Sequence, residues 1–461
     1  MNTPSLKRVL FVSYLFPPTG GVGVHRVSKF VKYLPEFGWS SSVLTVSNPS
    51  VPLVDESLIR DIPAGTLIRR AKTYEPGYAI KNSVAGGGHA RKGNPVFRFA
   101  KSCVRKMANA VLQPDPQILW HPKGYWAGLK LLEEVPHDAI IATGPPFSSL
   151  ILGARLSRKT GLPLILDYRD EWDISNAYWE NKGHGPISNW IQTCQQSYAV
   201  RAADLLLATT PSSARAVASF ARQHGSRADS AFIYNGFDPD DYPKSPAPQP
   251  RIVNGERRRF RLAFIGTLWN LNSIEPVVQG ILQLNREHPE LAAEMELLLA
   301  GRRTPDQEEL LTQLDQTSIE ITKLPFVSHD EAIQLMQSAD MLLMINSDLP
   351  KTQRIINAKT FEYMAARRPM MVVAPPGDVW DVVRDLPGTL LCPPGNIHGI
   401  ADALAMAIER YRCGQDDHDA VWEIQRFERR NLTGQLAGLL DRVIQGRTAK
   451  FKENMAVGVS G

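Results

Sequence analysis

Two series of short apolar runs, each alternating with stretches of helical spacing, constrain the fold of this chain more than any other feature. The first series consists of RVLFVSYL, SSVLTVS, TLIRRA, DAIIAT, LPLILDYRD, ADLLLATT and SAFIYNGF. The second consists of RLAFIGT, MELLLAG, SIEITKLPFV, ADMLLMIN, PMMVVAPP and GTLLCPP. Strands that alternate with helices form parallel sheets, so each series predicts an α/β domain. A chain of 461 residues is also too long for one ordinary core.

A proline-rich and polar stretch, DYPKSPAPQPRIVNGERRRF, separates the two series. Such a composition is typical of a linker. We therefore predict a first domain over residues 1–242, a linker over 243–260 and a second domain over 261–420. Two such domains would face each other across a cleft at the carboxyl ends of their strands, where open parallel sheets bind ligands.

The composition is that of an ordinary globular protein, with 43% hydrophobic and 21% charged residues. The four cysteines lack C-x-x-C spacing, which argues against a disulfide framework or a zinc site and fits a reducing cytoplasm. The chain passes from MNTPSLKR directly into a strand-like run, and its apolar runs are shorter than the roughly 18 residues that cross a bilayer. We therefore expect a cytoplasmic protein that would meet the cell membrane, if at all, at its inner face.

The segment formed by residues 81–114 carries seven Lys or Arg and no acidic residue. Apolar and basic side chains in its middle would lie on an amphipathic helix: Phe97, Val104, Val111, Arg98, Lys101, Arg105 and Lys106. Such a helix would suit anionic lipid headgroups. The alternative is a solvated basic helix on an insertion.

The stretch FVSYLFPPTGGVGVHRVSKFVKYL, residues 11–34, places glycines between a strand and a helix. The first N–H groups of a helix have no backbone partners, and the helix dipole adds partial positive charge there. Gly20, Gly21 and Gly23 lack the Cβ atoms that would keep a phosphate or a sugar from the backbone. The stretch therefore predicts an anion-binding turn, and the alternative is a tight turn that only needs positive φ.

A dinucleotide-binding fold is the obvious rival, because GVGVHR begins like the G-x-G-x-x-G fingerprint. The sequence departs from that fingerprint twice. Arg26 stands where the third glycine belongs, and the next strand, SSVLTVSNPS, ends without the Asp or Glu that would hold a ribose hydroxyl. We therefore reject the dinucleotide interpretation.

Six stretches occur in the order seen in glycosyltransferases of the GT-B fold: FVSYLFPPTGGVGVHRVSKFVKYLPEFGW, TGPPFSS, LDYRDEW, IYNGFDPDDY, FIGTL and KTFEYMAARRP. Over about residues 7–440 the chain resembles the large retaining, family 4-like group related to glycogen synthases and mannosyltransferases. The resemblance implies two Rossmann-like domains, the first for the acceptor and the second for the donor. Residues 421–446 resemble terminal helices that cross back to the first domain, which leaves 447–461 as a tail.

The resemblance assigns the acceptor to the first domain. TGPPFSS sets Gly144 at the end of a strand, with Ser148 as a candidate cap of the next helix. His25, beside the glycine-rich turn, joins Gly144 on the acceptor side. The alternative for TGPPFSS is a stiff turn without ligand contact.

LDYRDEW ends another strand with Asp167, Arg169, Asp170 and Trp172 close together. Carboxylates and an arginine at such an edge can orient acceptor hydroxyls, and the indole can stack on a sugar face. Asp170 is the leading candidate for a catalytic role. Alternatively, Arg169 and Asp170 form a structural ion pair.

FIGTLWN places Gly266 and Thr267 after a strand of the second domain, and this stretch resembles the diphosphate-binding turn of the family. Relatives commonly place an Arg and a Lys in or after this turn, and this chain does not. Another cation would then serve, either Arg302 or Arg303 after LLLAG, or Lys359, which we also assign a catalytic role.

RIINAKTFEYMAARRP resembles the E-x7-E region of the family. Its second glutamate, at the start of a helix, accepts hydrogen bonds from the ribose of the nucleotide, a task that suits an acceptor-only carboxylate. That residue is Glu362 here. Arg354 stands where the first glutamate would contact the donor sugar, so that half of the motif is absent.

The resemblance implies a retaining hexosyltransferase that uses a UDP- or GDP-sugar and needs neither a cofactor nor a metal. DPDDY at 238–242 is interpreted as the turn that ends the first domain, not as a D-x-D metal site. A glycan, a lipid-linked glycan or a small molecule would be the acceptor, and no nucleic acid is expected. The alternatives are a nucleotide-sugar epimerase or phosphorylase of the same fold, and a catalytically weak relative that serves as an assembly partner.

Overall fold

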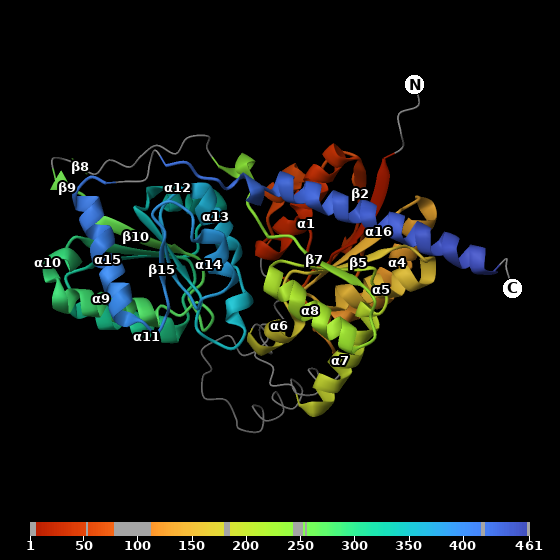
Figure 1. Cartoon of the computed structure of the whole chain (residues 1–461), viewed down its shortest axis with the longest axis horizontal. Coiled ribbons are helices and arrows are strands. Elements are labelled where there is room, and N and C mark those ends of the chain that lie inside the picture. Colours follow the sequence, from red (N-terminus) through yellow and green to blue (C-terminus); the bar gives the residue numbers. More distant parts are fainter. Residues whose placement is uncertain are drawn as a thin grey trace. The chain divides into compact units, whose positions relative to one another are not determined.

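The computed structural model describes residues 6–51, 54–77, 112–178, 185–242, 252–253, 256–415 and 420–458. The chain forms two compact units (Figure 1). Unit 1 holds Met1–Tyr234 together with Arg429–Gly461, and unit 2 holds Asn235–Glu428. Residues 81–111 of the predicted basic segment and most of the predicted linker 243–260 lie outside the described residues.

Seven parallel strands form the sheet of unit 1, in the order β3-β2-β1-β4-β5-β6-β7. Each apolar run of the first series forms one of them: β1 (Lys7–Val12), β2 (Trp39–Val46), β3 (Leu67–Ala71), β4 (Ala139–Gly144), β5 (Leu164–Tyr168), β6 (Leu205–Ala208) and β7 (Asp229–Phe232). The chain order reverses at β1, which pairs with both β2 and β4. Open parallel sheets bind ligands at such a switch point.

Helices cover both faces of this sheet. α1 (Val22–Tyr33) and α16 (Arg429–Gly458) bury their apolar sides against one face. The helices on the other face are α4 (His121–Glu134), α5 (Ser148–Thr160), α7 (Pro186–Val200) and α8 (Pro211–Gln223). Shorter helical segments complete the unit: α6 (Trp172–Tyr178), η1 (Leu34–Phe37), η2 (Glu56–Asp61) and η3 (Pro116–Trp120).

Unit 2 has a six-stranded parallel sheet in the order β12-β11-β10-β13-β14-β15. Its strands match the second series: β10 (Phe260–Ile265), β11 (Met295–Ala300), β12 (Glu320–Leu324), β13 (Met341–Ile345), β14 (Met370–Val373) and β15 (Leu390–Cys392). β10 pairs with both β11 and β13, so it marks the switch point of this sheet. The predicted α/β class and the two parallel sheets are therefore confirmed.

The helices of unit 2 also cover both faces of its sheet (Figure 1). One face carries α9 (Glu275–Glu287), α10 (Pro289–Ala292), α11 (Pro305–Thr312) and α15 (Ile397–Arg412). The other face carries α12 (His329–Ser338), α13 (Ala358–Ala366) and α14 (Asp378–Val383). The remaining elements are η4 (Pro239–Asp241), β8 (Ile252–Val253), β9 (Glu256–Arg257), η5 (Gln313–Gln316), η6 (Thr352–Arg354) and η7 (Gln425–Phe427).

The C-terminal region differs from the sequence prediction. α16 continues to Gly458 and so includes most of residues 447–461, which the sequence predicted as a tail. Leu432, Leu436 and Leu440 recur at helical spacing and are buried with the core that α1 covers, which explains why this helix belongs to unit 1. Among the described residues, no helix has the length and apolarity needed to cross a membrane.

Candidate functional site

The glycine-rich turn lies between β1 and α1, at the switch point of the unit 1 sheet. Gly21 directly precedes the helix, is exposed, and has a φ of +98°, which L side chains rarely adopt. A Cβ on Gly21 would meet no atom within 4 Å beyond its chain neighbours. Within the described residues, the N–H of Gly21 donates no hydrogen bond, whereas Gly20 follows Thr19, which forms an antiparallel bridge with Val54. Among the described residues, the turn therefore offers open space and the unpaired N–H of Gly21 to an anion.

Gly23, in the first turn of α1, makes room for an arginine. Arg169, which follows β5, donates from Nη1 to the carbonyl of Gly23 and from Nη2 to the carbonyl of Pro145. A Cβ on Gly23 would lie 2.7 Å from that Nη1 atom and 2.8 Å from Leu15. Gly23 is therefore needed for Arg169 to join α1 to the end of β4.

Arg169 and Asp170 are adjacent in sequence but have different surroundings. The guanidinium of Arg169 is buried and donates to backbone carbonyls, so it serves the internal framework of the edge. Asp170 is partly exposed and makes no hydrogen bond or ion pair within the described residues. Burial raises the pKa of Asp170, and the charge of Arg169 lowers it. The structural ion pair between these two residues, the alternative interpretation, is absent from the described residues, and Asp170 is available to a ligand.

Two other residues of LDYRDEW have internal roles that the sequence did not predict. Asp167 is 1% exposed and accepts hydrogen bonds from Arg26 and from the hydroxyl of Thr143, so it cannot orient an acceptor. Trp172 is 3% exposed and stacks on Phe147 with 4.4 Å between ring centres. The expectation that this indole stacks on a sugar is therefore wrong.

Gly144 and Ser148, on the predicted acceptor side, make hydrogen bonds to other parts of unit 1. Gly144 is buried, and its carbonyl accepts from the N–H of Arg169 at 2.9 Å. Ser148 does not cap α5 with its side chain; instead its N–H donates to Asp115 at 3.0 Å, so a more distant carboxylate takes the cap role. His25 is half-buried on the first turn of α1.

Unit 2 has a second glycine turn at its own switch point, where β10 ends. Lys359, in the first turn of α13, lies over Phe264 with its Nζ 4.0 Å from the ring centre. Gly266 has a φ of +146°, and a Cβ there would lie 2.6 Å from the same Nζ. Burial lowers the pKa of Lys359 to about 8, while the charge of Glu362 raises it. The ammonium makes no hydrogen bond or ion pair within the described residues, so it is a cation ready for an anionic ligand.

The backbone of this turn corrects one expectation. The N–H of Gly266 donates to the carbonyl of Ala300 at 2.8 Å, so it cannot also bind a diphosphate. Thr267 is exposed, and neither its N–H nor its hydroxyl has a hydrogen-bond partner within the described residues. Gly301, with a φ of +124°, approaches so closely that a Cβ would lie 2.2 Å from the Gly266 carbonyl oxygen. Gly266 therefore provides room for Lys359, and Thr267 provides the donors.

Arg302 and Arg303, which follow β11, differ in the direction of their side chains. Arg303 bonds to Glu308 at 2.5 Å and donates to the carbonyls of Gly301 and Leu324, each at 2.9 Å. Arg302 is exposed, and its side chain has no partner within the described residues. Of these two arginines, Arg302 is the one available to a ligand.

Glu362 lies in the second turn of α13 and not at the start of the helix, as the resemblance implied. It is half-buried and close to Tyr242: burial raises the pKa of Tyr242, and the charge of Glu362 raises it further. The DPDDY stretch therefore belongs to unit 2, where its tyrosine approaches the candidate ribose ligand, and is not the end of the first domain. Arg354 ends η6.

Sequence reasoning missed Phe326, which follows β12 at the same edge of the sheet. Its side chain is 73% exposed. The preceding carbonyl, of Pro325, accepts from the N–H of Gly301 at 3.1 Å, so Phe326 lies near the turn that carries Arg302. An exposed aromatic ring at a ligand-binding edge can stack on a planar base. The only sequence signal for Phe326 is a phenylalanine just after a strand-like run. Phenylalanines of the core occur in the same position, so this signal does not identify a ligand contact.

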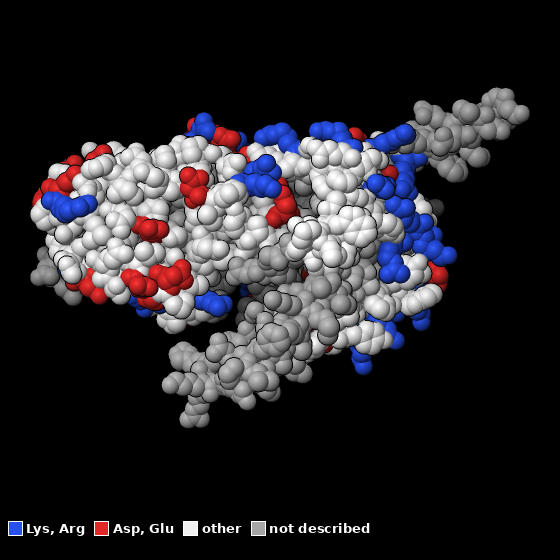
Figure 2. All heavy atoms as spheres, turned by 90° about the horizontal axis from the view of Figure 1, so that it is seen from below, with Lys and Arg blue, Asp and Glu red and all other residues white. Residues whose placement is uncertain are grey.

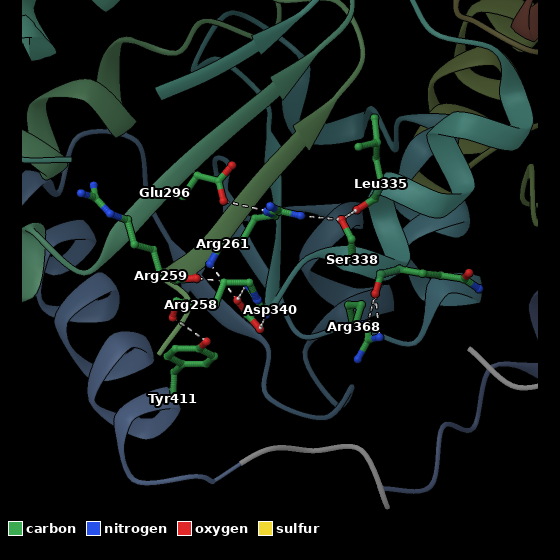
Figure 3. A network of polar contacts seen from close by, with 10 residues as sticks. Arg258, Arg259, Arg261, Glu296, Leu335, Ser338, Asp340, Arg368 and Tyr411 are labelled. Atoms are coloured by element: carbon green, nitrogen blue, oxygen red, sulfur yellow. Dashed lines mark hydrogen bonds and ion pairs between the residues drawn. The ribbon is translucent and has the colours of Figure 1, made fainter. Parts of the chain in front are cut away.

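A second polar cluster in unit 2 lies at the opposite ends of the strands (Figure 3). Arg258 donates from Nη1 and Nη2 to the two carboxylate oxygens of Asp340, each at 2.8 Å, and Arg261 donates from Nε to Glu296 at 2.8 Å. The hydroxyl of Tyr411 donates to the carbonyl of Arg258 at 2.8 Å. The charged side chains of this cluster pair with one another near the starts of β10 and β13. We therefore assign the cluster a structural role. Within the part of the chain that the structure describes, no group of three or more His, Cys, Asp and Glu could hold a metal ion.

Comparison with known proteins identifies the family. Residues 20–236 match the family described as "Glycosyl transferase 4-like domain", and residues 259–410 match "Glycosyl transferases group 1". The chain belongs to these glycosyltransferases. No curated protein sequence matches it.

Solved structures show the same fold. HepE of Anabaena, in complex with UDP and glucose, superposes with a TM-score of 0.56 at 16% identity, over 95% of this chain and 100% of that one. A UDP-forming trehalose-phosphate synthase of Burkholderia vietnamiensis gives a TM-score of 0.54 at 13% identity, over 95% and 100%. WaaG, a glycosyltransferase involved in lipopolysaccharide biosynthesis, gives 0.51 at 13% identity, over 94% and 99%. The glycosyltransferase thus has the GT-B fold.

Proposed function

We propose that this glycosyltransferase moves a hexose from a nucleoside diphosphate sugar to an acceptor hydroxyl, with retention of configuration. The observation that carries the proposal is Lys359, a half-buried ammonium at the switch point of unit 2 that feels the charge of Glu362 but makes no hydrogen bond or close ion pair with the described residues. A diphosphate would supply oxygens that accept charge-assisted hydrogen bonds from this ammonium. The HepE structures contain UDP and UDP-glucose, which supports a UDP-sugar ahead of a GDP-sugar as the donor.

On this proposal, different residues of unit 2 bind different parts of the donor nucleotide sugar. Lys359 and Arg302 bind the diphosphate electrostatically, and the N–H and hydroxyl of Thr267 donate hydrogen bonds to it. Glu362 accepts hydrogen bonds from the ribose hydroxyls. Phe326 stacks on the base. No cofactor or metal is assigned, because these side chains supply the charge and the donors.

On the acceptor side, Asp170 orients the hydroxyl that attacks, and His25 and the turn at Gly20–Gly21 contact the transferred sugar or its phosphate. The acceptor oxygen forms its bond to the anomeric carbon as the bond to the diphosphate oxygen breaks on the same face. The departing phosphate oxygen takes the proton of the acceptor. The protein then accelerates transfer by orientation and by stabilising the charge that develops on the diphosphate.

We further propose that the acceptor is a glycan, lipid-linked or free, or a small molecule, and that transfer takes place at the inner face of the cell membrane. Two features support this. The sequence of residues 81–114 carries seven uncompensated positive charges, which suit anionic lipid. The structural neighbour WaaG is described as acting in lipopolysaccharide biosynthesis.

Calorimetric titration with UDP, GDP and their sugars tests the donor assignment. Lys359→Met should weaken UDP binding by about 10- to 150-fold, the range expected for a lost charge-assisted contact. Lys323→Met is the matched control, because Lys323 lies in the same unit and its Nζ pairs with Glu308 at 3.0 Å. Unchanged UDP binding in Lys359→Met would refute the assignment.

Incubation of the UDP-sugar without an acceptor separates the rival activities. A transferase should leave the sugar intact or hydrolyse it slowly. Conversion to an epimeric nucleotide sugar would instead establish an epimerase. Failure to bind any nucleotide would favour an assembly partner without catalysis.

A further inference from the structure

α7 exposes its apolar side to solvent. Ile187, Trp190 and Tyr198 are 75%, 67% and 36% exposed, and Cys194 is exposed between them. Successive spacings of three, four and four residues place these side chains along one side of the helix. A stripe of this kind normally faces a core.

The polar side of α7 is fixed against the body of unit 1. Gln192 is 4% exposed, accepts from the indole N–H of Trp172 at 2.8 Å, and donates to Gln113 at 2.6 Å. Gln195 donates to the carbonyl of Gln113 at 2.9 Å. Rotation of the helix to bury its apolar stripe would break these bonds and leave buried amides unpaired, which is costly. The outward stripe is therefore a fixed feature of the fold.

The surface beside the stripe is basic. Arg158 of α5 lies 4.4 Å from the ring centre of Tyr198, and Arg155 and Lys159 are exposed on the same helix. Neither α5 nor α7 contains an acidic residue. Figure 2 shows Lys and Arg gathered over unit 1 and acidic side chains mainly over unit 2.

The sequence gives the same asymmetry. Unit 1 holds 33 Lys and Arg against 18 Asp and Glu, a formal charge of +15, whereas unit 2 holds 19 against 29, a charge of −10; together these make the +5 of the whole chain. A charge of this size on one unit attracts an anionic surface and repels a second copy of the same unit.

We propose that the exposed sides of α7 and α5 form a docking surface for an anionic lipid bilayer. Trp190 and Tyr198 would lie at the level of the headgroups, where their amphipathic rings are favoured, with Ile187 at the edge of the acyl region. Arg155, Arg158 and Lys159 would contact anionic headgroups. A second copy of the chain fits less well, because pairing two α7 stripes would also bring two basic α5 helices together. The proposal deepens the membrane association proposed above and rests on it.

Vesicle sedimentation of the full chain tests the surface. The protein should bind vesicles of phosphatidylglycerol and phosphatidylcholine in equal parts, with binding that weakens as salt increases, and should bind phosphatidylcholine alone poorly. The double variant Ile187→Ser, Trp190→Ser should bind the anionic vesicles roughly tenfold or more weakly, because it loses the two apolar side chains that the bilayer would bury. Met406→Ser, Val421→Ser is the matched control, since these side chains are 45% and 80% exposed on unit 2. Equal binding by both variants and the parent would overturn the proposal.

A fluorophore on Cys194 reports insertion directly. With Cys103 and Cys413 replaced by Ser, a polarity-sensitive dye on Cys194 should shift to shorter wavelength when anionic vesicles are added. A dye on the exposed Cys413 of unit 2, with Cys103 and Cys194 replaced, should not shift. A Cys194 signal that instead follows protein concentration without vesicles, with a dimer in sedimentation, would identify the stripe as a self-interface and overturn the proposal.

UDP titration of the same variants keeps the two proposals apart. Loss of vesicle binding with intact UDP affinity concerns the docking surface alone. Vesicle binding by a chain that binds no nucleotide would leave the docking surface standing and refute the proposed transferase function.

Discussion

Arg26 of α1 forms a buried ion pair with Asp167 of β5 that joins three parts of unit 1. The Nε of Arg26 lies 3.2 Å from both carboxylate oxygens of Asp167, and its Nη2 lies 3.0 Å from Oδ1. Its Nη1 donates to the carbonyls of Ile233 and Tyr234, the last residues of the first segment of unit 1. The residue that excludes the dinucleotide fingerprint thus ties the helix of the glycine turn to the sheet and to the exit of the chain.

Breaking this pair should destabilise unit 1 without a direct effect on ligand binding. Arg26→Met leaves Asp167 buried with a remaining hydroxyl partner, and such a loss costs about 3–5 kcal/mol. The free energy of unfolding from denaturant titration checks it, with Lys130→Met as the control. Lys130 is exposed and lies 3.9 Å from Glu134, so its loss should cost about 0–1 kcal/mol. Equal stability of the two variants would contradict the prediction, and adding Asp167→Leu to Arg26→Met should recover much of the loss.

Gly21 provides a test of the glycine turn as a ligand contact. A side chain at Gly21 meets open space in the free protein, so Gly21→Val should fold, with a backbone cost of about 1–3 kcal/mol, but should abolish transfer because it occupies the space of the ligand. Gly161→Val is the control: Gly161 has a φ of +75°, also faces open space, and ends α5. Thermal melting and turnover are measured for both. A folded Gly21→Val enzyme with parental turnover would show that the turn is only structural.

The fold was predictable because its signals are local. Each strand is a short apolar run bounded by turn residues, and alternation with helices dictates parallel pairing, so the order of runs in the sequence was enough to predict both sheets. Gly21 and Gly266 were also predictable as turn residues, because glycine after a strand is the usual device for positive φ.

The direction in which individual side chains point was not predictable in the same way. Arg302 and Arg303 are neighbours of one type, yet Arg303 turns inward because Glu308 and two carbonyls receive it. Trp172 is buried because Phe147, distant in sequence, offers a flat partner. Such choices depend on contacts between separate elements, and a single sequence contains no local signal for them.

Phe326 should contribute to nucleotide binding through its base. Stacking of an aromatic ring on a base is worth about 1–3 kcal/mol, so Phe326→Ala should weaken UDP binding by about 5- to 150-fold. Phe326→Tyr should retain most of the affinity, because the ring remains. Since the side chain is 73% exposed, neither change should lower the melting temperature appreciably. Calorimetry on the two variants decides, and equal affinity of Phe326→Ala and the parent would remove Phe326 from the site.

Lys359 should make nucleotide affinity and stability depend on pH in opposite directions. Its pKa is about 8 in the folded chain and 10.5 for an ordinary lysine. The unfolded chain therefore binds more protons between these values, so the free energy of unfolding rises as pH increases from about 8 to about 10.5. UDP needs the protonated form, whose fraction falls from about nine-tenths at about pH 7 to about one-tenth at about pH 9, so binding should weaken about tenfold.

Replacement by arginine checks this dependence, because a guanidinium keeps its charge throughout the range. The affinity of Lys359→Arg for UDP should be nearly constant between about pH 7 and pH 9. Titration calorimetry at both pH values compares it with the parent. A parent whose affinity is equally constant would show that Lys359 does not bind the diphosphate as an ammonium.

Glu362 should hold the ribose of the donor. A carboxylate that accepts from two hydroxyls gains charge-assisted bonds worth roughly 1.5–3 kcal/mol, so Glu362→Ala should weaken binding of the free nucleoside diphosphate by about 10- to 150-fold. Glu362→Gln should lose less, because one carbonyl acceptor survives. Glu409→Ala, an exposed glutamate within α15 of the same unit, serves as the control and should bind like the parent.

The stability of these variants separates a ligand contact from a structural role. Alanine favours a helix interior at least as well as glutamate, so Glu362→Ala should melt close to the parent temperature. In the parent, the charge of Glu362 raises the pKa of Lys359, so Glu362→Ala should lower that pKa further. The pH at which UDP binding weakens should fall accordingly. If Glu362→Ala binds the nucleotide as tightly as the parent, while another acid within residues 348–385 proves essential, the ribose contact belongs to that acid and the donor site is differently placed on α13.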